Sequence, residues 1–250
     1  METKPIVIDS FEPILLSELG HTNLLNRVDS KYVFQQDQLP NFLGWLSGNY
    51  RVLEVNNHRS ISYNSVYFDT PNFTLYHEHH CGKKNRLKIR FRNYVENDLT
   101  FFEIKFKTNR GRTLKSRMSY PGIENAIQGQ AKHFLESQTN LLATNLRAVL
   151  SVHYKRITLV HRKLNERITF DTDIRFENEF GSLMVPHLTL AEVKQERSER
   201  SLFTSLMKSN DIREGFISKY CFGLAGLVPK LRKNNFKKMI SKISTTSLCQ

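Results

Sequence analysis

Cations alternate with apolar residues along the most regular segment of this chain, RLKIRFRNY at residues 86–94. Side chains of a β-strand point alternately to its two faces, so Arg86, Lys88, Arg90 and Arg92 would share one face. Aligned cations are suited to binding an anion, because arginine and lysine donate charge-assisted hydrogen bonds to its oxygens. The anion could be a nucleic acid, an acidic membrane or a phosphorylated small molecule.

Four other segments show a similar alternation, at residues 27–31, 102–107, 167–171 and 192–194. A single strand of this kind is most simply an amphipathic strand whose charged face meets water. Five such strands are harder to explain in that way, because like charges at neighbouring positions of a sheet repel each other. An anion enclosed by the sheet would compensate this repulsion. The pattern therefore predicts a barrel with a cationic interior and apolar faces that point outward.

The elements expected from the sequence could build such a barrel. Strands are expected at residues 27–34, 50–56, 61–69, 85–94, 99–107, 114–120, 152–162, 166–175 and 187–195. Helices are expected at residues 10–26, 36–47, 123–150 and 199–209, and the last three could cover the apolar faces. The segment SKYCFGLAG at residues 218–226 is expected to be a glycine-rich connection. The fold class is therefore α+β, mostly antiparallel strands with helices packed outside.

The length of 250 residues can bury a substantial core in one domain. We expect a single domain over residues 1–228, including an N-terminal helix, followed by a basic tail or helix over residues 229–250. The longest apolar stretch, residues 221–228, is far shorter than the roughly 20 residues that span a bilayer. The N-terminus lacks the basic-then-apolar order of a signal peptide.

The charge balance and the cysteine content narrow the class of protein. There are 37 Lys+Arg and 24 Asp+Glu, which gives a net charge of +13 and favours an anionic partner. The 3 cysteines are too few and too scattered for a disulfide framework or a zinc site. We therefore expect a cytoplasmic protein, either free or peripheral at the inner membrane face.

Two glutamates stand among the cations of the expected strands. Glu103 precedes Lys105 by two residues, and Glu192 precedes Lys194 in the same way. As structural residues they would neutralise these lysines. As metal ligands they would hold Mg²⁺ or Mn²⁺, which binds one or two carboxylates together with substrate phosphates. The metal role is favoured more for Glu192 than for Glu103.

A series of short motifs follows one another along the chain: RVDSKYVF, YFDTPNFTLYHE, RLKIRFRNY, FFEIKFK, TLKSR, HYKR, ERITFDT, AEVK and SKY. In this order they resemble the VTC domain, the catalytic module of the polyphosphate polymerases. That domain belongs to the triphosphate tunnel metalloenzyme, or CYTH-like, superfamily. The resemblance implies an eight-stranded antiparallel β-barrel tunnel that binds ATP and Mn²⁺ or Mg²⁺, here in a stand-alone chain of the bacterial type.

The resemblance also implies roles for individual residues. The catalytic cations would be Arg90 and Arg92 of the basic strand, Lys105 of the Glu-x-Lys strand, Arg156 of the Tyr-x-Arg strand and Arg167 of the Arg-Ile-Thr strand. Three lysines match further cations of the family, Lys31, Lys115 and Lys219. The alternating strands add the substrate-binding candidates Arg86, Lys88, Lys107 and Lys194. Glu192 matches the metal-binding glutamate, with Glu103 as a second candidate.

The activity implied is the transfer of the γ-phosphate of ATP onto a polyphosphate chain. The superfamily's Glu-x-Glu-x-Lys opening reads Arg27-x-Asp29-x-Lys31 here, which is typical of the VTC branch and argues against a thiamine triphosphatase or an adenylate cyclase. Two alternatives stay open: a hydrolase of triphosphate or polyphosphate, and a non-catalytic module that binds polyphosphate or inositol phosphate.

Other partners are less favoured by the pattern. Nucleic-acid platforms interleave aromatic residues with cations on one face. Here Phe91, Phe102, Phe106 and Phe170 lie opposite the cations, so nucleic acid is an unlikely partner. The basic tail could dock on an acidic membrane or a membrane partner protein. Histidines 77, 79 and 80 are expected to be solvent-exposed helix residues rather than metal ligands.

Overall fold

The structure is a computed structural model and describes residues 7–19, 27–196, 201–215 and 218–236. The chain divides into two compact units. The first unit contains Met1–Ser62, Tyr154–Ile174 and Pro186–Ile217, and the second contains Tyr63–His153, Arg175–Val185 and Ser218–Gln250. The assignment of residues 1–228 to a single domain stays a prediction.

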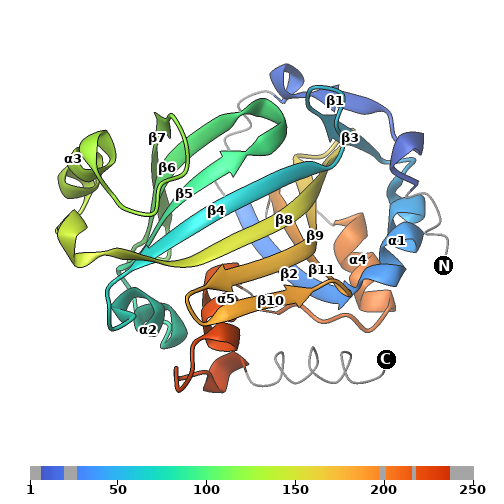
Figure 1. Cartoon of the computed structure of the whole chain (residues 1–250). Coiled ribbons are helices and arrows are strands. Elements are labelled where there is room, and N and C mark those ends of the chain that lie inside the picture. The colour runs from blue at the N-terminus through green and yellow to red at the C-terminus, as the bar shows by residue number, and fades with distance from the viewer. Residues whose placement is uncertain (1–6, 20–26, 197–200, 216–217, 237–250) are drawn as a thin grey trace. The chain divides into compact units, whose positions relative to one another are not determined.

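The first unit is built from strands and two short helices (Figure 1). Its elements are β1 (Pro13–Leu15), β2 (Arg27–Gln35), α1 (Leu39–Leu46), β3 (Tyr50–Glu54), β11 (Leu188–Glu196) and α4 (Leu202–Ser209). Parts of the long strands β8 (Arg147–His161) and β9 (Glu166–Asn178) also belong to it. Strand β11 pairs antiparallel with both β2 and β9.

The helices of the first unit cover the apolar face of its strands. Leu43 of α1 and Phe203 of α4 are fully buried in one core with Phe170 of β9 and Val193 of β11. Pro40 lies in the first turn of α1, where its missing N–H costs no helical hydrogen bond. The prediction that helices near residues 36–47 and 199–209 cover the apolar faces is therefore confirmed for this unit.

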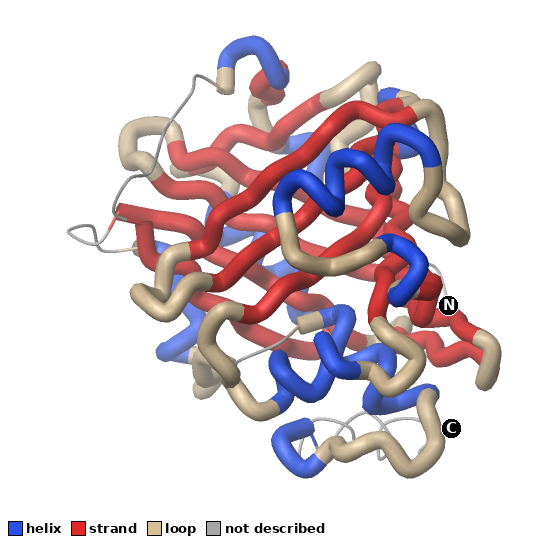
Figure 2. Tube along the Cα trace, turned by 90° about the vertical axis from the view of Figure 1, so that its left-hand side faces the viewer, coloured by secondary structure: helices blue, strands red, loops and turns tan. Residues whose placement is uncertain are grey.

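The second unit contains most of the basic motifs. Its elements are β4 (Ile61–Asp69), α2 (Thr74–His80), β5 (Arg86–Tyr94), β6 (Leu99–Lys107), β7 (Thr113–Tyr120), α3 (Gly129–Gln138), β10 (Gly181–Val185) and α5 (Lys219–Leu227). Strands β4, β5, β6 and β7 pair antiparallel in sequence order (Figure 1). Phe91 and Phe102 point from these strands into a core with Leu135 of α3 and Leu75 of α2. Figure 2 shows the helices as short segments beside the longer strands.

The described strands form an open sheet of 11 strands, so the prediction of a closed, eight-stranded barrel is wrong. The hydrogen-bonded order is β2-β11-β9-β8-β4-β5-β6-β7, with β1, β3 and β10 attached at its sides. The path of eight strands ends at β2 and β7, which do not pair with each other in the described residues. At the edge of β2, the carbonyl of Lys31 accepts a hydrogen bond from the N–H of Gly215 at 2.8 Å, and Gly215 does not belong to a strand.

Two expected helices are wholly or partly absent from the described residues. Residues 13–15 of the expected N-terminal helix form β1, which pairs parallel with β3 and buries Ile14; residues 20–26 lie outside the described residues. Of residues 123–150, only Gly129–Gln138 forms an α-helix, and β8 begins at Arg147. Alternating burial of Leu150 and Val152 in a sheet outweighs the helix-like spacing of this segment.

The prediction of a glycine-rich connection at residues 218–226 is wrong as well, because Lys219–Leu227 forms helix α5. The start of the expected basic tail packs against the second unit. Phe236 is buried, and the carbonyl of Arg232 accepts a hydrogen bond from the Tyr76 hydroxyl at 2.7 Å. Residues 237–250, which include the rest of the tail, lie outside the described residues. Within the described ranges, no helix is long and apolar enough to cross a membrane.

Candidate functional site

One face of β4–β7 carries the cations in rows. Lys88 of β5 lies opposite Lys105 of β6, which lies opposite Lys115 of β7. In the adjacent row Arg90 lies opposite Glu103. Arg90 is 4% exposed and Arg92 is 8% exposed. The arginines of this face are therefore buried, unlike those on the solvated face of an ordinary amphipathic strand, while Lys88 and Lys105 are partly buried and Lys115 is exposed.

Glu103 is the carboxylate at the centre of these cations. Its Oε2 accepts hydrogen bonds from Nε of Arg90 at 2.8 Å and from Nη2 of Arg90 at 2.6 Å. Its Oε1 lies 2.7 Å from Nζ of Lys115. Burial acts to raise the pKa of Glu103, but Arg90, Arg92 and Lys115 outweigh burial and hold the pKa below its ordinary value. Glu103 is therefore ionised and shared between two cations.

Two other cations of this face have no carboxylate partner among the described residues. Arg92 has the Ser65 hydroxyl 3.4 Å from its Nε and the Tyr63 ring centre 5.4 Å from its Cζ. Lys105 makes no ion pair within the described part of the chain, and Arg90, followed by burial and Arg92, holds its pKa well below the ordinary value. A buried cation without a counter-charge is unfavourable. An added anion would compensate this excess.

Arg86 is held by neighbours that the sequence analysis did not assign to it. Its Nε donates to Nδ1 of His79 at 3.1 Å, and its Nη1 donates to the carbonyl of Lys83 at 2.7 Å. Burial, with Lys88 and Arg86, lowers the pKa of His79 to about 3, so this imidazole is neutral. His80 is 5% exposed. The prediction of solvent-exposed histidines is therefore wrong for His80, because α2 turns this side chain toward Phe236, and His77 and His79 are only partly exposed.

The remaining cations of the second unit lie around this face. Lys107 lies opposite Arg86 at the end of β6. Lys219 is the first residue of α5, next to Ser218, whose Oγ accepts a hydrogen bond from Nζ of Lys88 at 2.9 Å. Arg117 lies over the Phe101 ring at 4.7 Å, and Arg110 and Arg112 are exposed in the β6–β7 turn.

The first unit has a charged face of its own. Glu192 of β11 lies opposite Lys31 of β2 and Thr169 of β9, and it forms an ion pair with Lys194. Burial acts to raise the pKa of Glu192, but Lys194, Lys31 and Arg156 outweigh burial and hold the pKa below its ordinary value. The Thr169 hydroxyl is buried and has no hydrogen-bond partner among the described residues.

Arg156 is paired with a carboxylate that the sequence analysis did not single out. Its Nε lies 2.5 Å from Oδ1 of Asp171, and its Nη2 lies 2.8 Å from Oδ2. This bidentate pair fixes the plane of the guanidinium. Arg167 lies opposite Lys194 in the register of β9 and β11. The first unit thus brings together Lys31, Arg156, Arg167, Glu192 and Lys194 on its charged strands.

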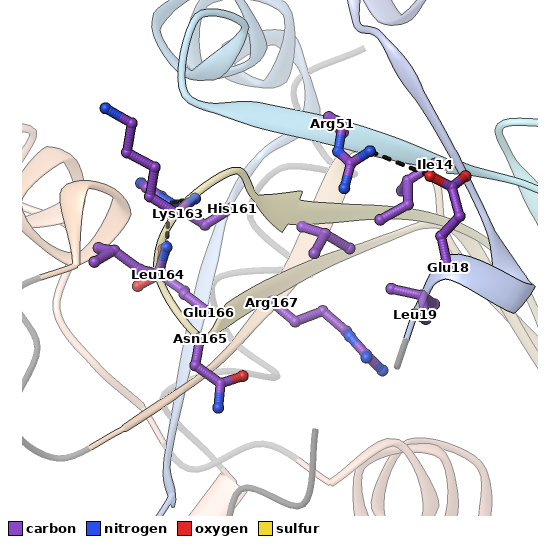
Figure 3. A pocket seen from close by; sticks show the side chains of 11 residues that line it. Ile14, Glu18, Leu19, Arg51, His161, Lys163, Leu164, Asn165, Glu166 and Arg167 are labelled. Atoms are coloured by element: carbon purple, nitrogen blue, oxygen red, sulfur yellow. Dashed lines mark hydrogen bonds and ion pairs between the residues drawn. The ribbon is translucent and has the colours of Figure 1, made fainter. Parts of the chain in front are cut away.

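A cavity of about 400 Å³ lies beside these strands in the first unit (Figure 3). Several of its polar groups are engaged with each other: Arg51 pairs with Glu18 at 3.4 Å, and Nδ1 of His161 accepts hydrogen bonds from the Lys163 and Leu164 amides. The side chains of Lys163 and Arg167 extend in different directions in Figure 3. The cations of this cavity do not converge on one point, and no ligand is assigned to it.

The second unit brings together the larger set of expected site residues, Arg86, Lys88, Arg90, Arg92, Glu103, Lys105, Lys107, Lys115 and Lys219. The residues that hold the candidate cations were not among the predicted site residues. Asp171, which binds Arg156 in the first unit, lies on the same face of β9 as Arg167, so the strand pattern could have identified it. Tyr67 and Tyr220 lie within the matched motifs YFD and SKY, but no spacing rule relates them to Arg90.

Residues 26–228 match the family model of the VTC domain. The chain belongs to the VTC domain family. The match has nearly the same limits as the motifs in the sequence, so the resemblance is confirmed. A comparison with curated protein sequences found no match.

Solved structures that resemble this VTC domain protein include two that are named as candidate adenylate or adenylyl cyclases. The Hippeastrum protein HpAC1, named as a candidate adenylyl cyclase with a dominant triphosphatase activity, is 14% identical, with a TM-score of 0.50 over 81% of this chain and 98% of that chain. A candidate adenylate cyclase from Bacillus halodurans is 11% identical, with a TM-score of 0.46 over 77% of this chain and 94% of that chain. The similarity to HpAC1 shows the fold alone.

Proposed function

We propose that this protein is an ATP-dependent polyphosphate polymerase, which transfers the γ-phosphate of ATP to the end of a polyphosphate chain. The observation that carries the proposal is the excess of buried positive charge on β5 and β6. Arg92 is 8% exposed and Lys105 is partly buried, and neither has a carboxylate partner among the described residues. Such a face is suited to a ligand with several negative charges in a row. Membership of the VTC domain family supports a phosphate chain as that ligand.

The cations would act by position and charge. Phosphoryl transfer spreads negative charge over the oxygens of the transferred group, and catalysis consists mainly of orienting and stabilising that group. Arg90, Arg92, Arg156 and Arg167 would bind phosphate oxygens, and Lys105 would add a point charge. The acceptor is a terminal phosphate, which is already anionic at neutral pH. The reaction therefore requires no general base.

The substrate-binding lysines and Arg86 would hold the rest of the chain of phosphates. In the second unit these residues are Arg86, Lys88, Lys107, Lys115 and Lys219. In the first unit they are Lys31 and Lys194. Lys115 differs from the others because it already pairs with Glu103 at 2.7 Å. It would thus contribute to phosphate binding less strongly than Lys105.

A divalent ion, Mn²⁺ or Mg²⁺, would be held at Glu192. The described residues contain no group of three or more His, Cys, Asp or Glu side chains that could hold a metal ion, and in this proposal substrate phosphates and water supply the further ligands. Glu192 fits this requirement, because the buried Thr169 hydroxyl opposite it has no hydrogen-bond partner among the described residues. Glu103 fits poorly, because Arg90 and Lys115 already occupy its two oxygens. The ion would neutralise phosphate charge when bound.

A triphosphate or polyphosphate hydrolase is the second candidate function. The observation that favours it is the fold shared with HpAC1, a protein described as having a dominant triphosphatase activity. The same cations would bind the substrate, and water would replace the phosphate acceptor. A third candidate function is a module that binds phosphate chains without converting them. This function requires only the cationic face of β4–β7.

Product analysis separates these functions. Purified protein is incubated with ATP and Mn²⁺ or Mg²⁺, with and without a short polyphosphate primer, and the products are resolved by gel electrophoresis and ³¹P NMR. Long polyphosphate with an equivalent amount of ADP is the expected result. Orthophosphate alone would replace the polymerase with the hydrolase. Unchanged ATP that raises the melting temperature would leave a binding module.

A further inference from the structure

The hydroxyl of Tyr67 lies against the guanidinium of Arg90 in the second unit. Nη1 of Arg90 donates a hydrogen bond to this oxygen at 2.7 Å, while Nε and Nη2 of Arg90 are bound to Glu103. The guanidinium is therefore held from two directions, by a carboxylate on β6 and by a phenol on β4. Tyr67 is 3% exposed, so water does not compete strongly for this bond.

Tyr67 is itself held by α5. The Tyr220 ring stacks on the Tyr67 ring with a centroid distance of 5.3 Å and an interplanar angle of 28°. The Tyr220 hydroxyl donates to Oδ2 of Asp69 at 2.5 Å, and Asp69 also accepts hydrogen bonds from the amides of Leu75 and Tyr76 at the start of α2. The position of the Tyr67 ring is thus fixed by a second ring that is anchored to a helix terminus.

Helix α5 and the residue before it also contact Lys88, a neighbouring cation on β5. Nζ of Lys88 donates to Oγ of Ser218, the residue before α5, and lies 5.6 Å from the centre of the Tyr220 ring. Tyr220 therefore lies between Tyr67 and Lys88. Residues far apart in the sequence, on β4, β5 and α5, meet at this point.

We propose that Tyr67 is a positioning residue, which orients the Arg90 guanidinium for phosphate and is itself fixed by Tyr220 and Asp69. This inference rests on the proposed function, because it assigns Arg90 to the binding of a phosphate chain. No role for Tyr67 in the chemical step is required. The hydroxyl acts through Arg90, so its removal alters the affinity for phosphate chains and the dependence of that affinity on pH.

The pH dependence follows from the groups that face the phenol. They are Lys88, Arg90 and Arg92 of β5, Glu103 and Lys105 of β6, Tyr220 of α5 and Asp69 of β4 itself. Burial acts to raise the pKa of Tyr67, but Arg90, Arg92 and Lys88 outweigh burial and lower it to about 8. Above that pH Tyr67 is a tyrosinate, and its negative charge offsets part of the positive charge of the cations that would bind a phosphate anion. Affinity for phosphate chains therefore falls as pH rises through 8.

The first experiment measures binding of inorganic tripolyphosphate by calorimetry between pH 7 and pH 9.5. The wild-type protein is expected to lose about tenfold in affinity across this range, since one unit of difference in pKa corresponds to tenfold. Tyr67→Phe removes the titrating group and the hydrogen bond to Arg90. It is expected to bind about tenfold more weakly at pH 7 and to lose the part of the pH dependence that comes from Tyr67, whereas the ionisation of tripolyphosphate itself affects both proteins equally.

The matched control is Tyr120→Phe, which removes a phenol hydroxyl from the same sheet. Tyr120 packs against Phe91 on the apolar face, and its hydroxyl donates to Glu124 at 3.2 Å. This variant is expected to keep both the affinity and the pH dependence of the wild-type protein. A Tyr67→Phe variant that matches Tyr120→Phe in both properties would overturn the proposal.

A second measurement needs no substitution. Titration of tyrosine absorbance in the near ultraviolet, with and without tripolyphosphate, reports the ionisation of Tyr67 in the wild-type protein. The bound anion compensates the cations, so the lowest tyrosine pKa is expected to rise on binding. Binding with no change in this pKa would overturn the positioning role while leaving the proposed function in place. A wild-type protein that does not bind tripolyphosphate would overturn both.

Discussion

Arg90 binds the carboxylate of Glu103 through two nitrogen atoms that approach a single oxygen, Nε at 2.8 Å and Nη2 at 2.6 Å from Oε2. Glu103 is completely buried and Arg90 nearly so. The second oxygen of Glu103 is thereby left for Lys115. One carboxylate compensates two cations, and the charge of Arg92 and Lys105 remains for a ligand. The balance of charge on this face therefore depends on Glu103.

Glu103→Gln is expected to destabilise the protein without ligand by about 3–5 kcal/mol, because removing one partner of a buried ion pair leaves the other charge uncompensated. The free energy of unfolding is measured by urea denaturation. Glu177→Gln is the control, since Glu177 is partly exposed and pairs with Arg175 at the surface. Equal stability of the two variants would show that Glu103 does not compensate Arg90 and Lys115.

Acid is expected to destabilise the protein through the same carboxylate. The pKa of Glu103 is held below its ordinary value of 4.5 in the folded state, so the folded protein binds fewer protons than the unfolded chain. The stabilisation is present above pH 4.5 and is lost as the pH falls through the folded pKa. Urea denaturation over a pH series should show a shallower decline in Glu103→Gln than in the wild-type protein. If the free energy of unfolding fell equally with pH in both proteins, Glu103 would not be the carboxylate whose pKa is lowered in the folded state.

Arg90→Ala is expected to lower the rate of phosphoryl transfer about a hundredfold or more, as the loss of one donor to the transition state does in other enzymes. The fold should persist at lower stability, because Arg90→Ala removes both hydrogen bonds to the buried Oε2 of Glu103 while Lys115 still pairs with Oε1. Rates of polyphosphate formation and melting temperatures test both statements. Arg175→Ala is the matched control, since Arg175 is exposed. A fully active Arg90→Ala protein would remove Arg90 from the site.

Glu192→Gln is expected to raise the Mn²⁺ concentration needed for half-maximal activity by roughly tenfold or more, because an amide is a weaker ligand than a carboxylate. A metal titration of activity at saturating ATP measures this change. Glu196→Gln, on the same strand, provides a control, since Glu196 accepts a hydrogen bond from Asn165 at the strand end. An unchanged metal requirement in Glu192→Gln would move the metal site elsewhere.

Gly223→Ala is expected to destabilise the second unit by about 1–3 kcal/mol through overpacking. A Cβ at this position would lie 2.5 Å from Cδ1 of Phe176 and 2.8 Å from Cδ2 of Leu150. Gly44→Ala in α1 meets nothing within 4 Å and should stabilise its helix by about 1 kcal/mol. Thermal unfolding of the two variants gives opposite shifts if α5 is packed as described.

The sequence by itself determined which residues share a face. The period of two along residues 86–94 separates Arg90 from Phe91 in any extended chain, because that separation depends only on local backbone geometry. The order of the motifs was likewise sufficient to predict the family. The rows of cations on β5, β6 and β7 follow from the same alternation once the hairpin after residue 94 sets the register.

Only the tertiary structure decided that the charged face is buried and how its cations are held. Burial of Arg90 requires β4 and α5, which bring Tyr67 and Tyr220 together from positions 153 residues apart. The helix at residues 219–227 also depends on packing, since Gly223 has a low helix propensity but permits close contact with Phe176. Long-range contacts of this kind leave no pattern in the local sequence from which they could be predicted. The contact at the edge of β2 is of the same kind, since the carbonyl of Lys31 accepts a hydrogen bond from the N–H of Gly215, which lies far along the chain.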